Sequence, residues 1–185
     1  MDSLYSKHVG ADTVTVYERV LFLFNGGMVR RYHTLPTNKE ITVAEHSWLV
    51  AALLTVLLPA PSAALLRAAL FHDCAEQLWG DLPAPVKWLD PNAQEIHTSM
   101  EQTTLQAFNC YNTITPDEQQ ALQLADSFAG MLECCKECAL GSKFLKEAYN
   151  RWHARIQMQS LRPQEKLVLD AIQKLWSQAT IGDIR

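Results

Sequence analysis

Four residues of types that commonly bind metal ions stand on or beside apolar segments of the chain: His46, His72, Asp73 and Asp126. Burying an ionisable side chain is costly unless a partner compensates its charge. Taken singly, a buried histidine is most often a hydrogen-bonded core residue, and a single aspartate is most often an ion-pair partner. Taken together, two imidazoles and two carboxylates from three segments form a nitrogen and oxygen ligand set, which suits Zn, Mn, Fe or Co better than Mg. The set predicts a site for a divalent transition metal.

Three more charged residues follow His72 and Asp73 within the segment ALFHDCAEQLWGDLPAPVKW. Glu76 lies four residues after His72, and in a continuous helix the two side chains would share one face. From there Glu76 could orient a water molecule at the metal or exchange its proton. Asp81 follows a glycine break and could act on the same water, and Lys87 is a candidate phosphate anchor. The alternative interpretation treats Glu76, Asp81 and Lys87 as ordinary surface charges.

Helical periodicity dominates the chain, and no segment shows the sustained alternation that is typical of strands. Thr42, with Glu45 three positions later, is a capping box that begins the most apolar segment. Thr115, followed by a proline and two acidic residues, is a second start signal. Asn25-Gly26-Gly27 predicts a helix end, and residues 28–41 predict a loop. We therefore expect an all-α fold, a single helical bundle over residues 1–185, with helices near 13–24, 43–58, 62–78, 92–110, 116–140, 143–158 and 163–177.

The composition argues against several broad classes of function. The chain of 185 residues favours one domain, and a hydrophobic content of 48% provides a substantial core. A formal net charge of −4 without a basic tract argues against binding of long nucleic acids. Five cysteines without a regular framework fit a reducing compartment, and the longest apolar run, WLVAALLTVLLPAP, is too short to span a bilayer. We therefore expect a cytoplasmic protein without a membrane segment.

Several other features receive no catalytic assignment. Cys135 and Cys138 form a CxxC pattern, but without a second pair and in a helical setting we assign it to packing. His97 is likewise given no role in the site. The apolar content of the helices beyond Gly141 predicts a homo-oligomer.

The spacing of the metal-binding residue types resembles that of the HD-domain phosphohydrolases, whose pattern is a histidine, then a His-Asp doublet, then a distant aspartate. The corresponding segments are EHS at His46, FHD at His72 and Asp73, and LAD at Asp126. The longer segments RRYHTLP, TVAEHS, HDCAE and GDLPAPVK resemble the branch that includes bacterial 5′-deoxynucleotidases and phage enzymes that remove dATP. The resemblance extends from about Met28 to about Gly141 and so covers most of the chain.

The resemblance implies a helical fold in which these four residues bind a divalent metal ion, namely Zn, Co or Mn. A second divalent ion would accompany the substrate phosphates. Glu76 and Asp81 are implied to handle the catalytic water or its protons. The residues implied in binding a deoxynucleotide substrate are Arg31 and Lys87 at the phosphate, Tyr32 at the sugar or base, in a position where tryptophan is common, and Thr34 in the same base-facing loop.

The activity that the resemblance favours is hydrolysis of a deoxynucleoside triphosphate to deoxynucleoside and triphosphate, with dATP as the leading substrate. Such an enzyme would deplete dATP in the host cytoplasm for a phage whose DNA replaces adenine with 2-aminoadenine. The main alternative is a 5′-deoxynucleotidase that acts on monophosphates, and the choice depends on the room beyond the α-phosphate. A third hypothesis, a non-catalytic nucleotide-binding protein of the same fold, is disfavoured because Glu76 and Asp81 are both present.

Overall fold

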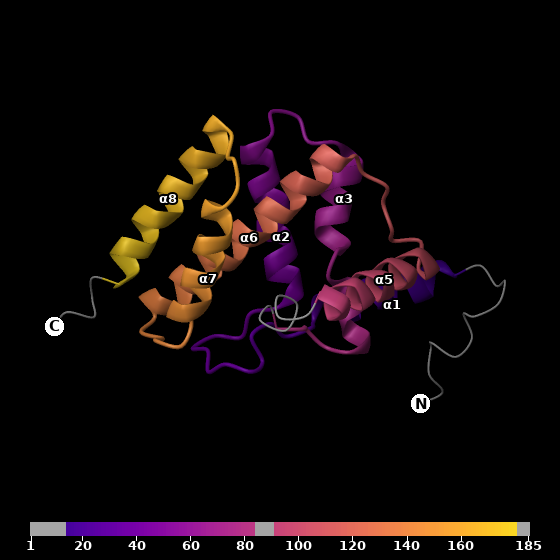
Figure 1. The fold of residues 1–185 in the computed structure, drawn as a ribbon. Helices are drawn as coiled ribbons and strands as arrows, with labels where there is room; N and C mark the ends of the chain where they lie inside the picture. The colour runs from indigo at the N-terminus through magenta and orange to yellow at the C-terminus, as the bar shows by residue number, and fades with distance from the viewer. Residues whose placement is uncertain (1–13, 84–90, 181–185) are drawn as a thin grey trace.

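The computed structural model describes residues 14–83 and 91–180, which form helices joined by short connections (Figure 1). Within these ranges there is no strand, and the one extended pairing is an isolated antiparallel bridge between Arg30 and Thr42. The predicted all-α class is confirmed, whereas the assignment of residues 1–185 to one domain stays a prediction. No described helix is long and apolar enough to cross a membrane. The elements are α1 (Val16–Gly27), α2 (Val43–Leu57), α3 (Ala63–Phe71), the short 3-10 helix η1 (Cys74–Leu78), α5 (Pro91–Ala107), α6 (Pro116–Ala139), α7 (Lys146–Gln157) and α8 (Pro163–Thr180).

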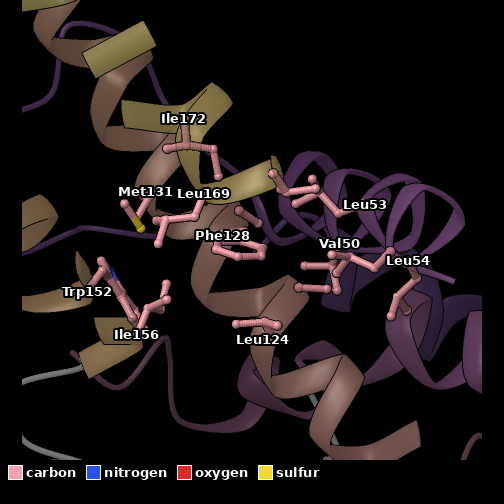
Figure 2. Packing of buried hydrophobic residues seen from close by; sticks show 14 of the residues in the cluster. Val50, Leu53, Leu54, Leu124, Phe128, Met131, Trp152, Ile156, Leu169 and Ile172 are labelled. Carbon is pink, nitrogen blue, oxygen red and sulfur yellow. The ribbon is translucent and has the colours of Figure 1, made fainter. Parts of the chain in front are cut away.

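The central element of the bundle is α6, which packs against α2, α3, α7 and α8. Figure 2 shows side chains of α6 meeting those of three neighbouring helices in one apolar cluster. Burial of each large apolar side chain contributes about 1.5–3 kcal/mol, so this cluster fixes how the helices are spaced. The labelled residues of the cluster are Val50, Leu53 and Leu54 of α2, Leu124, Phe128 and Met131 of α6, Trp152 and Ile156 of α7, and Leu169 and Ile172 of α8.

Three of the described helices, α1, α2 and α6, begin at capping boxes. Thr42 and Thr115, both predicted as caps, each accept a hydrogen bond from the backbone N–H three residues later. Thr15 makes the same arrangement at the start of α1, which the sequence reading placed slightly earlier. Each such cap stabilises a helix by about 0.5–2 kcal/mol. The cap at Thr42 also fixes the entry into α2, where His46 occupies the first turn.

Helix α1 ends at Gly27, which confirms the predicted helix end at Asn25-Gly26-Gly27. Gly26 also permits a close contact between two elements. A Cβ atom on Gly26 would lie 2.7 Å from the carbonyl oxygen of Cys74, so only glycine lets α1 approach η1 this closely. The glycine therefore supports the segment that immediately follows His72 and Asp73.

The predicted continuous helix over 62–78 is interrupted at its most important point. Helix α3 ends at Phe71, and the backbone of Asp73, at φ −97° and ψ 1°, leads into the tighter η1. The N–H of Glu76 then donates to the carbonyl of Asp73 at 3.0 Å. Because the helix is broken, the helical spacing that placed His72 and Glu76 on one face does not apply.

The predicted homo-oligomer rested on apolar residues beyond Gly141, but exposed apolar side chains also gather on α1. Val16, Tyr17, Val20 and Phe24 are each at least 60% exposed. Single exposed apolar residues are normal on protein surfaces. The homo-oligomer therefore stays a prediction.

Candidate metal centre and catalytic cleft

Three of the four predicted metal ligands meet at one point between α2, the end of α3 and α6. One ring nitrogen of His46, one of His72 and a carboxylate oxygen of Asp126 all lie within 4.8 Å of one another. The two imidazole rings are 5.5 Å apart at their centroids. Since the residues lie 26 to 80 positions apart in the chain, their convergence results from the packing of α2 and α3 on α6.

Each histidine has its ring orientation fixed by a hydrogen bond at Nδ1. His46 Nδ1 lies 2.8 Å from Oε1 of Glu133, and His72 Nδ1 lies 2.8 Å from the carbonyl oxygen of Ala69. Both partners are acceptors, so each Nδ1–H donates away from the point where the ligands meet, and each Nε2 faces that point. His46 Nε2 is 2.9 Å from Oδ1 of Asp126, on the side where the ligands meet.

The fourth predicted ligand, Asp73, stands beside this group and is shared with a cation of the protein. Its Oδ2 lies 3.2 Å from His72 Nε2 and 3.9 Å from His46 Nε2. The same oxygen accepts a hydrogen bond of 2.7 Å from Nη1 of Arg31. The structure therefore brings Arg31, predicted to contact phosphate, directly against the predicted metal ligands.

Charges at the centre shift the pKa values of its residues in the directions expected for a cation site. Burial alone lowers the pKa of His72, but the carboxylates of Asp73 and Asp126 outweigh it and raise this pKa to about 9. Burial alone raises the pKa of Asp73, yet His72, Arg31 and His46 together hold it well below its ordinary value. The carboxylates are thus ionised, and the site favours positive charge.

The donor set fits a divalent transition metal ion. His72 Nε2 is buried and, among the described residues, makes no hydrogen bond, since Asp73 lies at ion-pair distance without hydrogen-bond geometry. An orphaned buried nitrogen beside a second imidazole and two carboxylates is the arrangement that Zn, Co or Mn satisfies. His46, His72, Asp73 and Asp126 would hold such an ion.

Glu133 is a residue of this site that the sequence reading missed. Only 5% of the residue is exposed, and its two carboxylate oxygens receive His46 Nδ1–H and the hydroxyl of Tyr32, the latter at 2.8 Å. Burial alone raises the pKa of Glu133, but His46 and Arg31 lower it, so the carboxylate is ionised. The available signal was its spacing, because Glu133 follows Asp126 by two helical turns on an apolar helix.

The loop between α1 and α2 is held at its base by backbone hydrogen bonds. Arg31 N donates to the carbonyl of Ile41 at 2.8 Å, and Val43 N donates to that of Val29 at 2.9 Å. Farther along the loop, the backbone N–H groups of residues 38 and 39 donate to the buried carboxylate of Glu137 on α6. These bonds tie the loop to the helix that carries Asp126.

Tyr32 in that loop adopts a backbone conformation that is rare for a large side chain, with φ at +53°. Its N–H donates to Oδ2 of Asp81 at 3.1 Å, and its hydroxyl donates to Glu133. Such strain costs about 1–3 kcal/mol and persists where surrounding contacts impose it. Tyr32 and Thr34 both line the cleft described next, and their contact with a substrate stays a prediction.

The candidate metal centre opens into a cleft of about 480 Å³, within the size range of small-molecule sites. His72, Asp73, Asp126 and Asp81 line it, together with residues of α5, α6 and α7. Two groups on its walls were not anticipated. One is His97 with Glu101 on α5, and the other is Arg151 with Arg155 on α7.

Glu76, predicted to act on the water, is fully buried and does not line the cleft. Oxygen and nitrogen atoms of Glu76, His97 and Glu101 lie within 4.8 Å of one another. His97 Nε2 accepts a hydrogen bond from the Trp79 indole at 3.2 Å, and its Nδ1 lies 3.1 Å from Glu101. His97 is therefore part of the cleft wall, and its lack of a role in the site stays a prediction. The catalytic roles of Glu76 and Asp81 stay predictions, and Lys87 lies outside the described residues.

Comparison with known families decides the assignment of the chain. The family described as 5′-deoxynucleotidase YfbR-like matches residues 22–174. The chain belongs to this family. The predicted relationship to the HD-domain phosphohydrolases, a group of hydrolases, is thereby confirmed. A 5′-deoxynucleotidase of Vibrio cholerae is 27% identical over 129 residues, which cover 56% of this YfbR-like chain and 66% of that protein.

Solved structures share the fold of this YfbR-like chain. An HD-domain phosphohydrolase from Listeria innocua superposes with a TM-score of 0.74 at 19% identity, covering 90% of this chain and 92% of that one. The cyanophage S-2L HD phosphohydrolase DatZ, bound to dA and one catalytic Zn²⁺ ion, superposes with a TM-score of 0.62 at 19% identity, covering 91% and 99%. At this identity the likeness shows the HD fold.

Proposed function

We propose that the protein is a metal-dependent 5′-deoxynucleotidase, which hydrolyses a deoxynucleoside monophosphate to deoxynucleoside and phosphate. The observation that carries this proposal is the convergence of His46, His72 and Asp126 at the head of a cleft large enough for a nucleotide. The YfbR-like family and the Vibrio cholerae relative support the monophosphate as the substrate class. Zn, Co or Mn is the proposed metal.

When bound, a divalent ion lowers the pKa of a coordinated water from about 15.7 to about 7 and neutralises a phosphate oxygen. The protein's own residues then place the phosphate. Arg31, whose guanidinium contacts Asp73, is positioned to bind phosphate oxygens beside the metal ligands. Asp81 lines the cleft and can accept a proton there. Glu76 does not line the cleft but lies close to His97 and Glu101, which do.

The base and sugar are assigned to the loop side of the cleft. Tyr32 and Thr34 line it, and the Tyr32 ring is held by its hydroxyl bond to Glu133. A close aromatic wall leaves little space for a 2′-hydroxyl, which supports a preference for deoxynucleotides. We propose that substitutions at these two positions alter base preference more than the rate on the best substrate.

A second candidate is the dATP triphosphohydrolase activity predicted from the sequence. The observation that favours it is the cleft itself, which extends past the metal ligands to two arginines of α7. The fold likeness to DatZ, whose structure holds dA, is compatible with a purine substrate. Specificity for dATP and a role in a phage with 2-aminoadenine DNA stay predictions.

The test is hydrolysis of each dNMP, dNTP and rNMP with Zn, Co, Mn or Mg, or with a chelator, and separation of the products by chromatography. We expect phosphate and deoxynucleoside from dNMPs in the presence of Zn, Co or Mn, and loss of activity with the chelator. Activity that survives both chelation and Asp73→Ala would refute the metal mechanism. Binding of metal and nucleotide without turnover under any condition would instead support the non-catalytic alternative.

A further inference from the structure

The wall of the cleft formed by α7 carries two cations that the reaction on a monophosphate does not use. Among the described residues that line the cleft, the lysine and arginine side chains are Arg31, Arg151 and Arg155. Arg31 is buried and already contacts Asp73, with Glu133 close by at 3.7 Å. Arg151 and Arg155 lie one helical turn apart on α7, so their side chains share a face.

The packing of α6 and α7 brings this face to the level of the metal centre. After the short connection at residues 140–145, α7 runs back along α6 (Figure 1). The two helices meet where a Cβ on Gly130 would lie 3.0 Å from Nε1 of Trp152. Asp126 lies one turn before Gly130 on α6, and Arg155 lies nearly one turn after Trp152 on α7. Because the helices are antiparallel, both displacements run in the same direction, and Arg155 comes level with Asp126.

Arg151 is available to bind an anion. Its recorded partner is Glu147, one turn back on the same helix, and the two side chains are 45% and 73% exposed. Such exposed pairs contribute little stability, so a phosphate can replace the carboxylate at small cost. The guanidinium group is also suited to bidentate contact with phosphate oxygens. The neutral side chains of Gln119 and Gln123 on α6 also line the cleft and offer further hydrogen-bond donors.

We propose that Arg151 and Arg155 bind the phosphates beyond the α-phosphate, so that the site also accepts deoxynucleoside triphosphates. This inference rests on the proposed hydrolysis at the same centre. The bond that breaks is the same for both substrates. Water oxygen bonds to the α-phosphorus, the α-phosphorus to O5′ bond breaks and O5′ takes a proton. The products from a triphosphate are deoxynucleoside and triphosphate. A triphosphate carries more negative charge than one metal ion and Arg31 can neutralise, and the two α7 arginines supply the difference.

The test compares the double variant Arg151→Gln/Arg155→Gln with the matched control Arg67→Gln/Lys166→Gln. The control makes the same change in net charge at exposed positions of α3 and α8 that do not line the cleft. For the α7 variant, we expect kcat/KM on dNTPs to fall about 10-fold to 100-fold more than kcat/KM on dNMPs, as expected for lost charge-assisted hydrogen bonds. For the control, we expect both values to stay at the wild-type level.

A second readout does not depend on turnover. Inorganic tripolyphosphate is titrated into the metal-free proteins by calorimetry. We expect the α7 variant to bind it at least about 10-fold more weakly than wild type and control do. Equal binding by all three proteins, or equal losses on dNMP and dNTP, would overturn the inference. A wild type that hydrolyses dNMPs but not dNTPs would also overturn it and leave the proposed function intact. A wild type that hydrolyses neither would refute the proposed function, and tripolyphosphate binding would still decide the role of the arginines.

Discussion

Replacing Glu133 by glutamine tests whether the carboxylate behind His46 tunes the metal centre. Oε1 of Glu133 receives the His46 Nδ1–H at 2.8 Å, and Oε2 receives the Tyr32 hydroxyl at the same distance. Glutamine keeps an oxygen that can accept from His46, and its amide group can donate to the Tyr32 oxygen. The substitution therefore removes the negative charge while preserving shape and hydrogen bonding.

The expected effect follows from the role of such partners. A carboxylate behind a metal-bound histidine makes the imidazole a stronger ligand, and its loss typically lowers metal affinity or activity 10-fold to 100-fold. This corresponds to about 1.4–2.8 kcal/mol. Arg31 loses one nearby carboxylate, 3.7 Å away, but keeps its 2.7 Å contact with Asp73, so the protein should stay folded.

The assay is competition for Zn²⁺ or Co²⁺ with a chromophoric chelator, alongside thermal unfolding and dNMP hydrolysis. Tyr32→Phe is the matched control, because it removes the donor to the other oxygen of Glu133 and leaves the His46 contact in place. We expect its metal affinity to change less than that of Glu133→Gln. A folded Glu133→Gln protein with wild-type metal affinity would refute the proposed role of the carboxylate.

Three further predictions concern the same structure. Asp126→Asn should lower metal-dependent hydrolysis at least about 100-fold, since a catalytic metal supplies several kcal/mol of charge stabilisation, and unchanged kinetics would remove Asp126 from the site. Folding raises the pKa of His72 from 6.5 to about 9. The stabilisation that the protonated imidazole gives the metal-free protein is therefore fully present below pH 6.5 and is lost as pH rises through 9. Thermal unfolding in chelator should thus show a decline between these values that His72→Ala flattens. Gly26→Ala should destabilise the protein by about 1–3 kcal/mol relative to Gly27→Ala, because its Cβ would lie 2.7 Å from Cys74 O whereas that of residue 27 meets a side chain at 3.3 Å. Equal midpoints in denaturant would contradict this contact.

The helices of this protein were readable from the sequence because their signals are local. The capping boxes at Thr42 and Thr115 each involve residues three positions apart, and the apolar periodicity extends over single helices. The metal-binding residue types were readable for a related reason, since His46, His72, Asp73 and Asp126 fall into short segments that resemble a known family.

The break after α3 was not readable, because it depends on contacts between distant segments. The sequence AALLRAALFHDCAEQL favours a continuous helix, yet the close approach of Gly26 to Cys74 accompanies a change to a tighter turn. That turn is why Glu76 meets His97 and Glu101, a grouping that no local pattern of the sequence predicts.

By itself, the sequence determined an all-α chain and the residue types from which a metal centre can be built. Only the tertiary structure decided which atoms of those residues face the centre. Nε2 of His46 is presented because Glu133, 87 positions later, accepts the proton of Nδ1. In the sequence, Arg151 and Arg155 look like ordinary surface charges. The packing of α7 on α6 places both of them in the wall of the cleft. Local propensities act over a few residues, whereas these distances are set by apolar burial between helices that are far apart in the chain.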